Sequence, residues 1–250
     1  MQDKLFALDF DGVICDSALE TGLSGWQVAH RYWPDMPVAM PEAILADFRN
    51  VRPVMETGFE AILICRLLFE GVAVTSLLAD FPHHIEQLSR REKLDTNALK
   101  VQFGAYRDNW IANDLTDWIK MNPLYPGMSN LLEQIPQEQR FIITTKQQRF
   151  VSAILAANNI VIPDSQIFGL ERKLSKPQIL NNLQAQHPRA DIVFVEDRLL
   201  TLLDVINTEN LEAVQLYFAG WGYNTTADKQ QAQQHPRITY LPQLASFNLQ

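Results

Sequence analysis

Four short apolar runs constrain the fold of this chain most strongly. Each has the length and the continuous apolar character of a strand that is covered on both faces, and helical sequence lies between the later ones. Strand, helix and strand joined by short connections are typical of a parallel sheet with right-handed crossovers. The sequence therefore predicts an α/β protein whose strands lie at residues 5–9, 140–145, 191–197 and 211–219.

The long segment between the first and second runs, residues 17–123, contains almost no strand signal. Its patterns predict helices that start at Pro41, over an apolar stretch from Ile62 to Phe69 that stops at Gly71, and from a capping Asp95 or Thr96 to just before Pro123. We therefore predict an all-helical cap domain, residues 17–123, inserted after the first strand of a core domain of residues 1–16 and 124–250. Ligands of such sheets bind at the carboxyl ends of the strands, where this insert emerges.

Charge and composition exclude several classes of partner. The formal net charge is −8 and the sequence has no run of Lys and Arg, so nucleic acid and anionic membranes are not expected partners. No segment has the roughly 20 apolar residues that span a bilayer. The N-terminus lacks the features of a signal peptide, and the two cysteines lie in apolar surroundings. We expect a cytoplasmic monomer or homodimer.

Two acids, Asp9 and Asp11, follow the first strand, and Gly12 permits a tight turn after them. Two carboxylates this close repel each other unless a cation lies between them or one of them holds a proton. The alternative is that both are turn residues that accept backbone N–H groups.

The next polar residues follow the second strand and precede a later helix. Thr144 and Thr145 lie where a helix N-terminus could bind an anion, although threonine is also a common strand residue and N-cap. Lys176 precedes Pro177 at a helix start, where the helix dipole disfavours a cation. Either an anionic group lies nearby, or Lys176 is a solvated surface lysine.

The third strand ends in two adjacent acids, Glu196 and Asp197. Neighbouring side chains of a regular strand point to opposite faces, so both acids can face one site only if the chain bends there. Asp197 could also cap a helix that begins near Arg198.

In this chain order, the segments DFDGV, IITT, SKP and FVED resemble the four motifs of the haloacid dehalogenase (HAD) superfamily of phosphohydrolases. The insert after the first motif resembles the subgroup with phosphoglycolate phosphatase-like and β-phosphoglucomutase-like enzymes. The segments LYPGM and WGYNTT also look like family segments, and the resemblance covers residues 1–16 and 124–245. It implies a Rossmann-like parallel sheet core with a helical cap.

The resemblance also implies a role for each matching residue. Asp9 would be the nucleophile that forms an aspartyl-phosphate, and Asp11 the general acid and base. Thr144, Thr145, Lys176 and Gly12 would bind the phosphoryl group, with Thr144 and Lys176 also counted as catalytic. A Mg²⁺ cofactor would be held by Asp9, Asp11, Asp197 and, as a further candidate, Glu196. The expected reaction is hydrolysis of a small phosphorylated metabolite.

Departures from the family pattern leave alternatives open. The family has an acid four or five residues after the Asp of the last motif, where this chain has Thr201 and Leu202. Asp204 is seven residues after Asp197, about 10 Å along a helix. Glu196 could replace that acid or point to the far face. A phosphomutase of the β-phosphoglucomutase type and a catalytically weak HAD-fold binding protein are the alternative functions.

One further candidate lies in the cap. Arg52 could reach the substrate, or it could belong to a surface salt-bridge cluster with Arg49, Glu56 and Glu60.

Overall fold

A computed structural model describes residues 4–249 of the chain. The chain forms two compact units, one of Met1–Asp16 with Leu124–Gln250 and one of Ser17–Pro123. We call the first the α/β unit and the second the helical unit, and describe each by itself.

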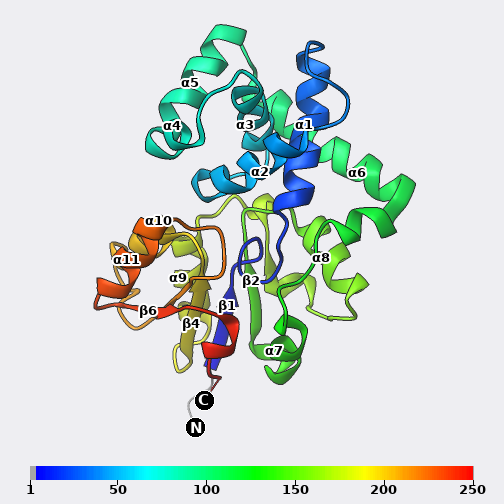
Figure 1. Cartoon of the computed structure of the whole chain (residues 1–250). Helices are drawn as coiled ribbons and strands as arrows, with labels where there is room; N and C mark the ends of the chain where they lie inside the picture. Colours follow the sequence, from blue (N-terminus) through cyan, green and yellow to red (C-terminus); the bar gives the residue numbers. More distant parts are fainter. Residues whose placement is uncertain (1–3, 250) are drawn as a thin grey trace. The chain divides into compact units, whose positions relative to one another are not determined.

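The α/β unit is built on a parallel sheet of six strands, which confirms the predicted α/β class. The strand order is β3-β2-β1-β4-β5-β6 (Figure 1). The four predicted runs form β1 (Lys4–Leu8), β2 (Arg140–Ile143), β4 (Asp191–Glu196) and β5 (Gln215–Ala219). Two short strands that were not predicted, β3 (Ile167–Phe168) and β6 (Ile238–Leu241), form the edges of the sheet.

Helices cover both faces of this sheet. Figure 1 shows α9, α10 and α11 on one side and α7 and α8 on the other. Alternate strand residues, among them Leu5, Ala7 and Phe194, are buried in one apolar cluster with residues of α9 and α10. The bounds are α7 (Met128–Gln134), α8 (Gln148–Ala157), α9 (Lys176–Gln186), α10 (Leu199–Ile206) and α11 (Thr226–Gln234).

The order of the strands places the ligand crevice. The chain winds outward from β1 through β2 to β3, and then from β4 through β5 to β6. The direction of winding therefore reverses between β1 and β4, and ligands of open parallel sheets bind outside the carboxyl ends of the strands at that point.

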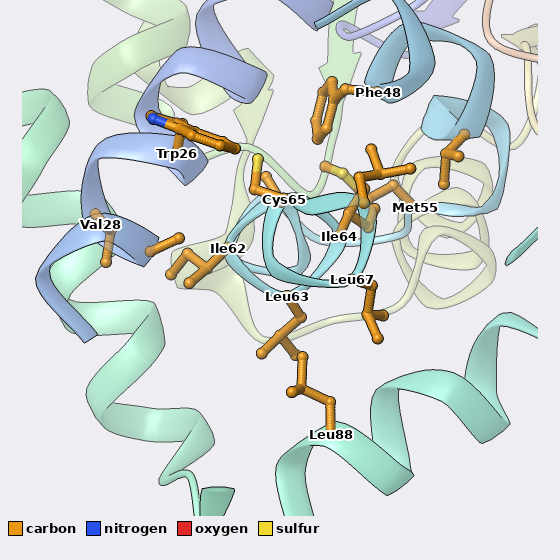
Figure 2. Packing of buried hydrophobic residues seen from close by; sticks show 14 of the residues in the cluster. Trp26, Val28, Phe48, Met55, Ile62, Leu63, Ile64, Cys65, Leu67 and Leu88 are labelled. Atoms are coloured by element: carbon orange, nitrogen blue, oxygen red, sulfur yellow. The ribbon is translucent and has the colours of Figure 1, made fainter. Parts of the chain in front are cut away.

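The helical unit has an apolar core of its own around α3 (Glu60–Phe69). Figure 2 shows Ile62, Leu63 and Leu67 projecting from α3 in different directions, as expected for a helix that is apolar nearly all round. The other helices are α1 (Ala18–Tyr32), α2 (Glu42–Val51), α4 (Val74–Ala79), α5 (Phe81–Glu92) and α6 (Thr96–Lys120). Pro41 precedes α2, and the Asp95 side chain caps α6, as the sequence indicated.

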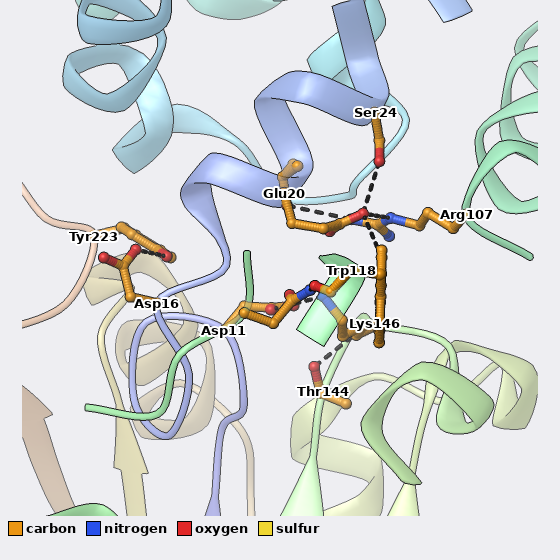
Figure 3. A network of polar contacts seen from close by, with 11 residues as sticks. Asp11, Asp16, Glu20, Ser24, Arg107, Trp118, Thr144, Lys146 and Tyr223 are labelled. Carbon is orange, nitrogen blue, oxygen red and sulfur yellow. Dashed lines mark hydrogen bonds and ion pairs between the residues drawn. The ribbon is translucent and has the colours of Figure 1, made fainter. Parts of the chain in front are cut away.

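A buried ion pair joins α1 to α6 inside the helical unit (Figure 3). Arg107 donates from Nε and Nη2 to the two carboxylate oxygens of Glu20, at 2.7 and 2.6 Å. Ser24 and Trp118 donate to the same carboxylate. The pair is therefore hydrogen-bonded on several sides, which is the condition under which buried charges are tolerated.

Within residues 4–249, none of the helices combines the length and the apolar character that crossing a membrane requires.

Candidate active site

Three buried carboxylates meet at the carboxyl ends of β1 and β4. Asp9 directly follows β1, and its backbone N–H donates to the Val195 carbonyl of β4 at 2.9 Å. Glu196 is the last residue of β4 and Asp197 follows it. One carboxylate oxygen from each of Asp9, Glu196 and Asp197 lies within 4.8 Å of the others. This convergence falls at the place that the strand order indicates for a ligand.

A bend at Asp197 lets two adjacent acids approach the same site. The strand geometry ends at Glu196, so the alternation of side chains between faces ends there as well. Glu196 is not turned to the far face. The alternative that Asp197 caps α10 is wrong, because Arg198 is the N-cap.

Separate backbone groups hold the two acids in place. Glu196 Oε1 accepts a hydrogen bond from the Arg198 N–H at 3.0 Å. Asp197 Oδ2 accepts one from the Tyr223 N–H at 2.6 Å. The Tyr223 hydroxyl in turn donates to Asp16 at 2.8 Å, as Figure 3 shows.

Gly12 allows the backbone after β1 to pass close to Asp197. Its φ is +94°, and a Cβ at this position would lie 2.0 Å from Asp197 Oδ2. Gly222 approaches from the other side, where a Cβ would lie 2.3 Å from the Gly12 carbonyl oxygen. Gly12 thus forms the tight turn that the sequence indicated, and any larger residue would displace Asp197.

Lys176 lies among these acids, so the alternative of a solvated surface lysine is wrong. It is the first residue of α9, and the preceding Ser175 forms a capping box with Gln178. The Lys176 ammonium donates to Asp9 Oδ1 at 2.7 Å and to Glu196 Oε2 at 2.6 Å. These two carboxylates offset the unfavourable helix dipole that the sequence pointed to.

Burial dominates the electrostatics of Asp9. Desolvation raises the pKa of Asp9 to about 7, because an ionised carboxylate loses its hydration in the interior. Lys176 opposes this rise, whereas the charges of Glu196 and Asp11 add to it. The pKa of Lys176 is raised, because the two carboxylates outweigh the effect of its own burial.

The loop after β2 contributes Thr144, Thr145 and a lysine that the sequence reasoning missed. Thr144 is buried, Thr145 is partly exposed, and neither caps α8, whose N-cap is Gln147. The Lys146 ammonium donates to Asp11 Oδ1 at 3.0 Å, and its backbone N–H donates to Thr144 Oγ1 at 3.0 Å (Figure 3). A single lysine after two threonines carries no distinctive pattern, so no signal singled it out.

The remaining candidates belong to α10 and to the helical unit. Thr201 and Leu202, at the positions of the missing family acid, are buried in α10, whereas Asp204 is exposed. Arg52 belongs to the helical unit, where it begins a single 3₁₀ turn and donates from Nη1 to the Met55 carbonyl at 3.4 Å. In the same unit, Glu60 accepts the backbone N–H groups of Glu56 and Thr57.

The three carboxylates fit a hard dication. Their donor atoms are all oxygen, which is the ligand type that Mg²⁺ prefers. The three acids are buried close together, and a cation among them would offset the repulsion between their charges. Asp9, Glu196 and Asp197 are therefore the residues able to hold such an ion.

Comparison with known proteins identifies the fold. No family model and no curated protein matches the sequence. Solved structures do match, each over 96% of this chain. A predicted phosphoglycolate phosphatase from Haemophilus somnus is 17% identical over 94% of its own length, with a TM-score of 0.59. A predicted phosphatase from Clostridium acetobutylicum (15% identity, 95% of that chain, TM-score 0.55) and a haloacid dehalogenase-like hydrolase from Streptococcus pneumoniae (17% identity, 95% of that chain, TM-score 0.56) are similar as well. The chain therefore has the fold of haloacid dehalogenase-like phosphatases, as its motifs indicated.

Proposed function

We propose that the protein is a Mg²⁺-dependent phosphatase that hydrolyses a small phosphorylated metabolite through an aspartyl-phosphate on Asp9. The observation that carries the proposal is the buried convergence of Asp9, Glu196 and Asp197, with Lys176 bonded to two of them. In this proposal Asp9 is the nucleophile, Lys176 the neighbouring cation, and the three carboxylates an all-oxygen metal site at the ligand crevice of the sheet.

Each residue has a defined part in the first step. An Asp9 oxygen attacks phosphorus, so a bond forms between them while the bond from phosphorus to the ester oxygen breaks. Asp11 gives a proton to the departing oxygen. The Thr144 hydroxyl accepts the Lys146 N–H, which leaves its own proton to donate to a phosphoryl oxygen.

The second step restores Asp9. Water attacks phosphorus, Asp11 takes a proton from that water, and the bond from phosphorus to Asp9 breaks. Lys176 stabilises the Asp9 carboxylate before the reaction and after it. A bound Mg²⁺ would supply positive charge that favours ionised Asp9 and offsets the charge of the phosphoryl group.

The test is release of inorganic phosphate from a broad panel of phosphorylated metabolites, with Mg²⁺ and with EDTA. We expect Mg²⁺-dependent hydrolysis of a subset of the panel. Asp9→Asn should lower kcat by at least about 1000-fold, whereas Asp204→Asn, which removes an exposed acid of α10, should leave it unchanged.

The other outcomes are equally informative. Full activity of Asp9→Asn would show that Asp9 is not the nucleophile. Isomerisation of a sugar phosphate without release of phosphate would favour the phosphomutase, and inactivity over the whole panel would favour a binding role.

A further inference from the structure

We propose that Lys146 is a positioning residue for Asp11, fixing the direction in which this carboxyl transfers protons. The inference rests on the proposed function and adds to it a residue outside the matched motifs. Lys146 Nζ lies 3.0 Å from Asp11 Oδ1, across 135 positions of the sequence.

The burial of Lys146 separates this contact from an ordinary surface ion pair. Only 1% of the Lys146 side chain is exposed, compared with 16% for Asp11. Moving an ammonium from water into the interior has a large free-energy cost unless it is paired. Exposed pairs, by contrast, contribute little and hold their partners loosely. The Lys146 ammonium is therefore a fixed donor that can orient its partner.

The backbone around Lys146 is held firmly on both sides. The Thr144 N–H donates to the Phe168 carbonyl at 3.0 Å, and the Leu170 N–H donates to the Lys146 carbonyl at 3.1 Å. The Gln148 N–H donates to the Glu171 carboxylate at 3.0 Å. The loop after β2 is thus bonded at three points to the end of β3 and the segment after it.

The approach of these two segments leaves no room for a side chain at Gly169. A Cβ there would lie 2.7 Å from the Gln148 nitrogen and 2.9 Å from the Lys146 carbonyl oxygen. A rigid loop of this kind keeps a supported residue within the small tolerance that proton transfer requires.

The contact gives the two oxygens of the Asp11 carboxyl different roles. Oδ1 accepts a hydrogen bond from Lys146, and we assign to Oδ2 the proton that passes to the departing oxygen and, later, the proton that comes from water. Without Lys146 the carboxyl loses this fixed donor, and proton transfer becomes slower while the attack of Asp9 is unaffected. Loss of Lys146 should therefore reproduce the pattern of Asp11→Asn more weakly.

Two aryl phosphates of similar size separate proton transfer from attack. Phenyl phosphate has a basic leaving oxygen that needs a proton, whereas 2,4-dinitrophenyl phosphate has one that needs none. For Lys146→Met we expect kcat/KM to fall about 10- to 100-fold with phenyl phosphate and less than about threefold with 2,4-dinitrophenyl phosphate. The control Lys4→Met, at the amino end of β1, should change neither.

The double variant decides whether Lys146 acts through Asp11. Adding Lys146→Met to Asp11→Asn should lower kcat/KM for phenyl phosphate by less than about threefold further. Urea unfolding of wild type, the two single variants and the double variant provides a measurement that needs no activity. The shift of the unfolding midpoint in the double variant should differ from the sum of the two single shifts. Lys146→Gln serves the same purpose if Lys146→Met does not fold.

The contrary outcomes are distinct. Three results would overturn the role of Lys146 without affecting the proposed phosphatase activity. They are equal losses of kcat/KM with both esters, a raised KM that adds to the effect of Asp11→Asn, and additive shifts of the unfolding midpoint. A wild-type protein that hydrolyses neither these esters nor the metabolite panel counts against the proposed function instead.

Discussion

Replacing Asp9 by asparagine is expected to stabilise the protein at pH 8 when divalent metal is absent. Burial raises the pKa of Asp9 to about 7 from an ordinary value of 3.8. A carboxyl whose pKa is raised in the folded state contributes stability that is fully present below pH 3.8. That stability is lost as the pH rises through about 7. At pH 8 the folded protein must hold Asp9 ionised, and asparagine removes this cost.

The structure sets the size of the effect. The difference between the two pKa values corresponds to about 4 kcal/mol in the free energy of unfolding. This raised pKa already contains the opposing effect of Lys176, which keeps its bond to Glu196 when Asp9 is replaced. We therefore expect a gain of up to about 4 kcal/mol at pH 8.

The assay is urea unfolding in EDTA at several values between pH 5 and pH 8. The free energy of unfolding of wild type minus that of Asp9→Asn gives the contribution of Asp9. Asp204→Asn is the control for an exposed acid. The wild-type free energy of unfolding should fall relative to the variant as the pH rises. A difference that does not change with pH, or a variant less stable than wild type at pH 8, would show that ionising Asp9 does not destabilise the folded protein.

The remaining predictions concern three other positions. Arg107→Ala removes the guanidinium that pairs with buried Glu20 and should lower the free energy of unfolding by about 3–5 kcal/mol in urea denaturation. Gly12→Ala forces a Cβ against Asp197. The Kd for Mg²⁺ in calorimetric titration should therefore rise by more than about tenfold. Tyr223→Phe keeps the backbone N–H that Asp197 accepts, so it should cost only about 0.5–1.5 kcal/mol of stability and leave Mg²⁺ affinity unchanged.

Each of these has a contrary result. A cost below about 1 kcal/mol for Arg107→Ala would mean that the helical unit does not depend on this pair. Unchanged Mg²⁺ affinity in Gly12→Ala, or a large loss of it in Tyr223→Phe, would contradict the packing described around Asp197.

The parts of the fold that were predicted are those with mostly apolar runs inside the sheet. The strands β1, β2, β4 and β5 lie inside the sheet and have continuous apolar runs, so their sequences stand out. The strands β3 and β6 form its edges. β3 has only two residues, and β6 has four, of which only the first and last are buried, so neither has a pattern that stands out from a loop.

The site was predicted where residue type and motif order agreed. Asp9, Lys176 and Asp197 were named from the sequence, and the structure brings Asp9 into hydrogen-bond contact with Lys176 and into one cluster with Asp197. Two features depended on geometry that a sequence does not encode locally. The approach of Glu196 follows from the bend after β4, and the contact of Lys146 with Asp11 follows from the pairing of β1 with β2.

The most direct test of the central claim is chemical trapping of the phosphorylated enzyme. The protein would be mixed with its best substrate from the panel, quenched in acid during turnover, reduced with borohydride and mapped by mass spectrometry. Reduction converts an aspartyl-phosphate to homoserine. We expect homoserine at Asp9 in wild type and none in Asp9→Asn. Modification at another residue, or turnover with no modification at Asp9, would rule out Asp9 as the nucleophile.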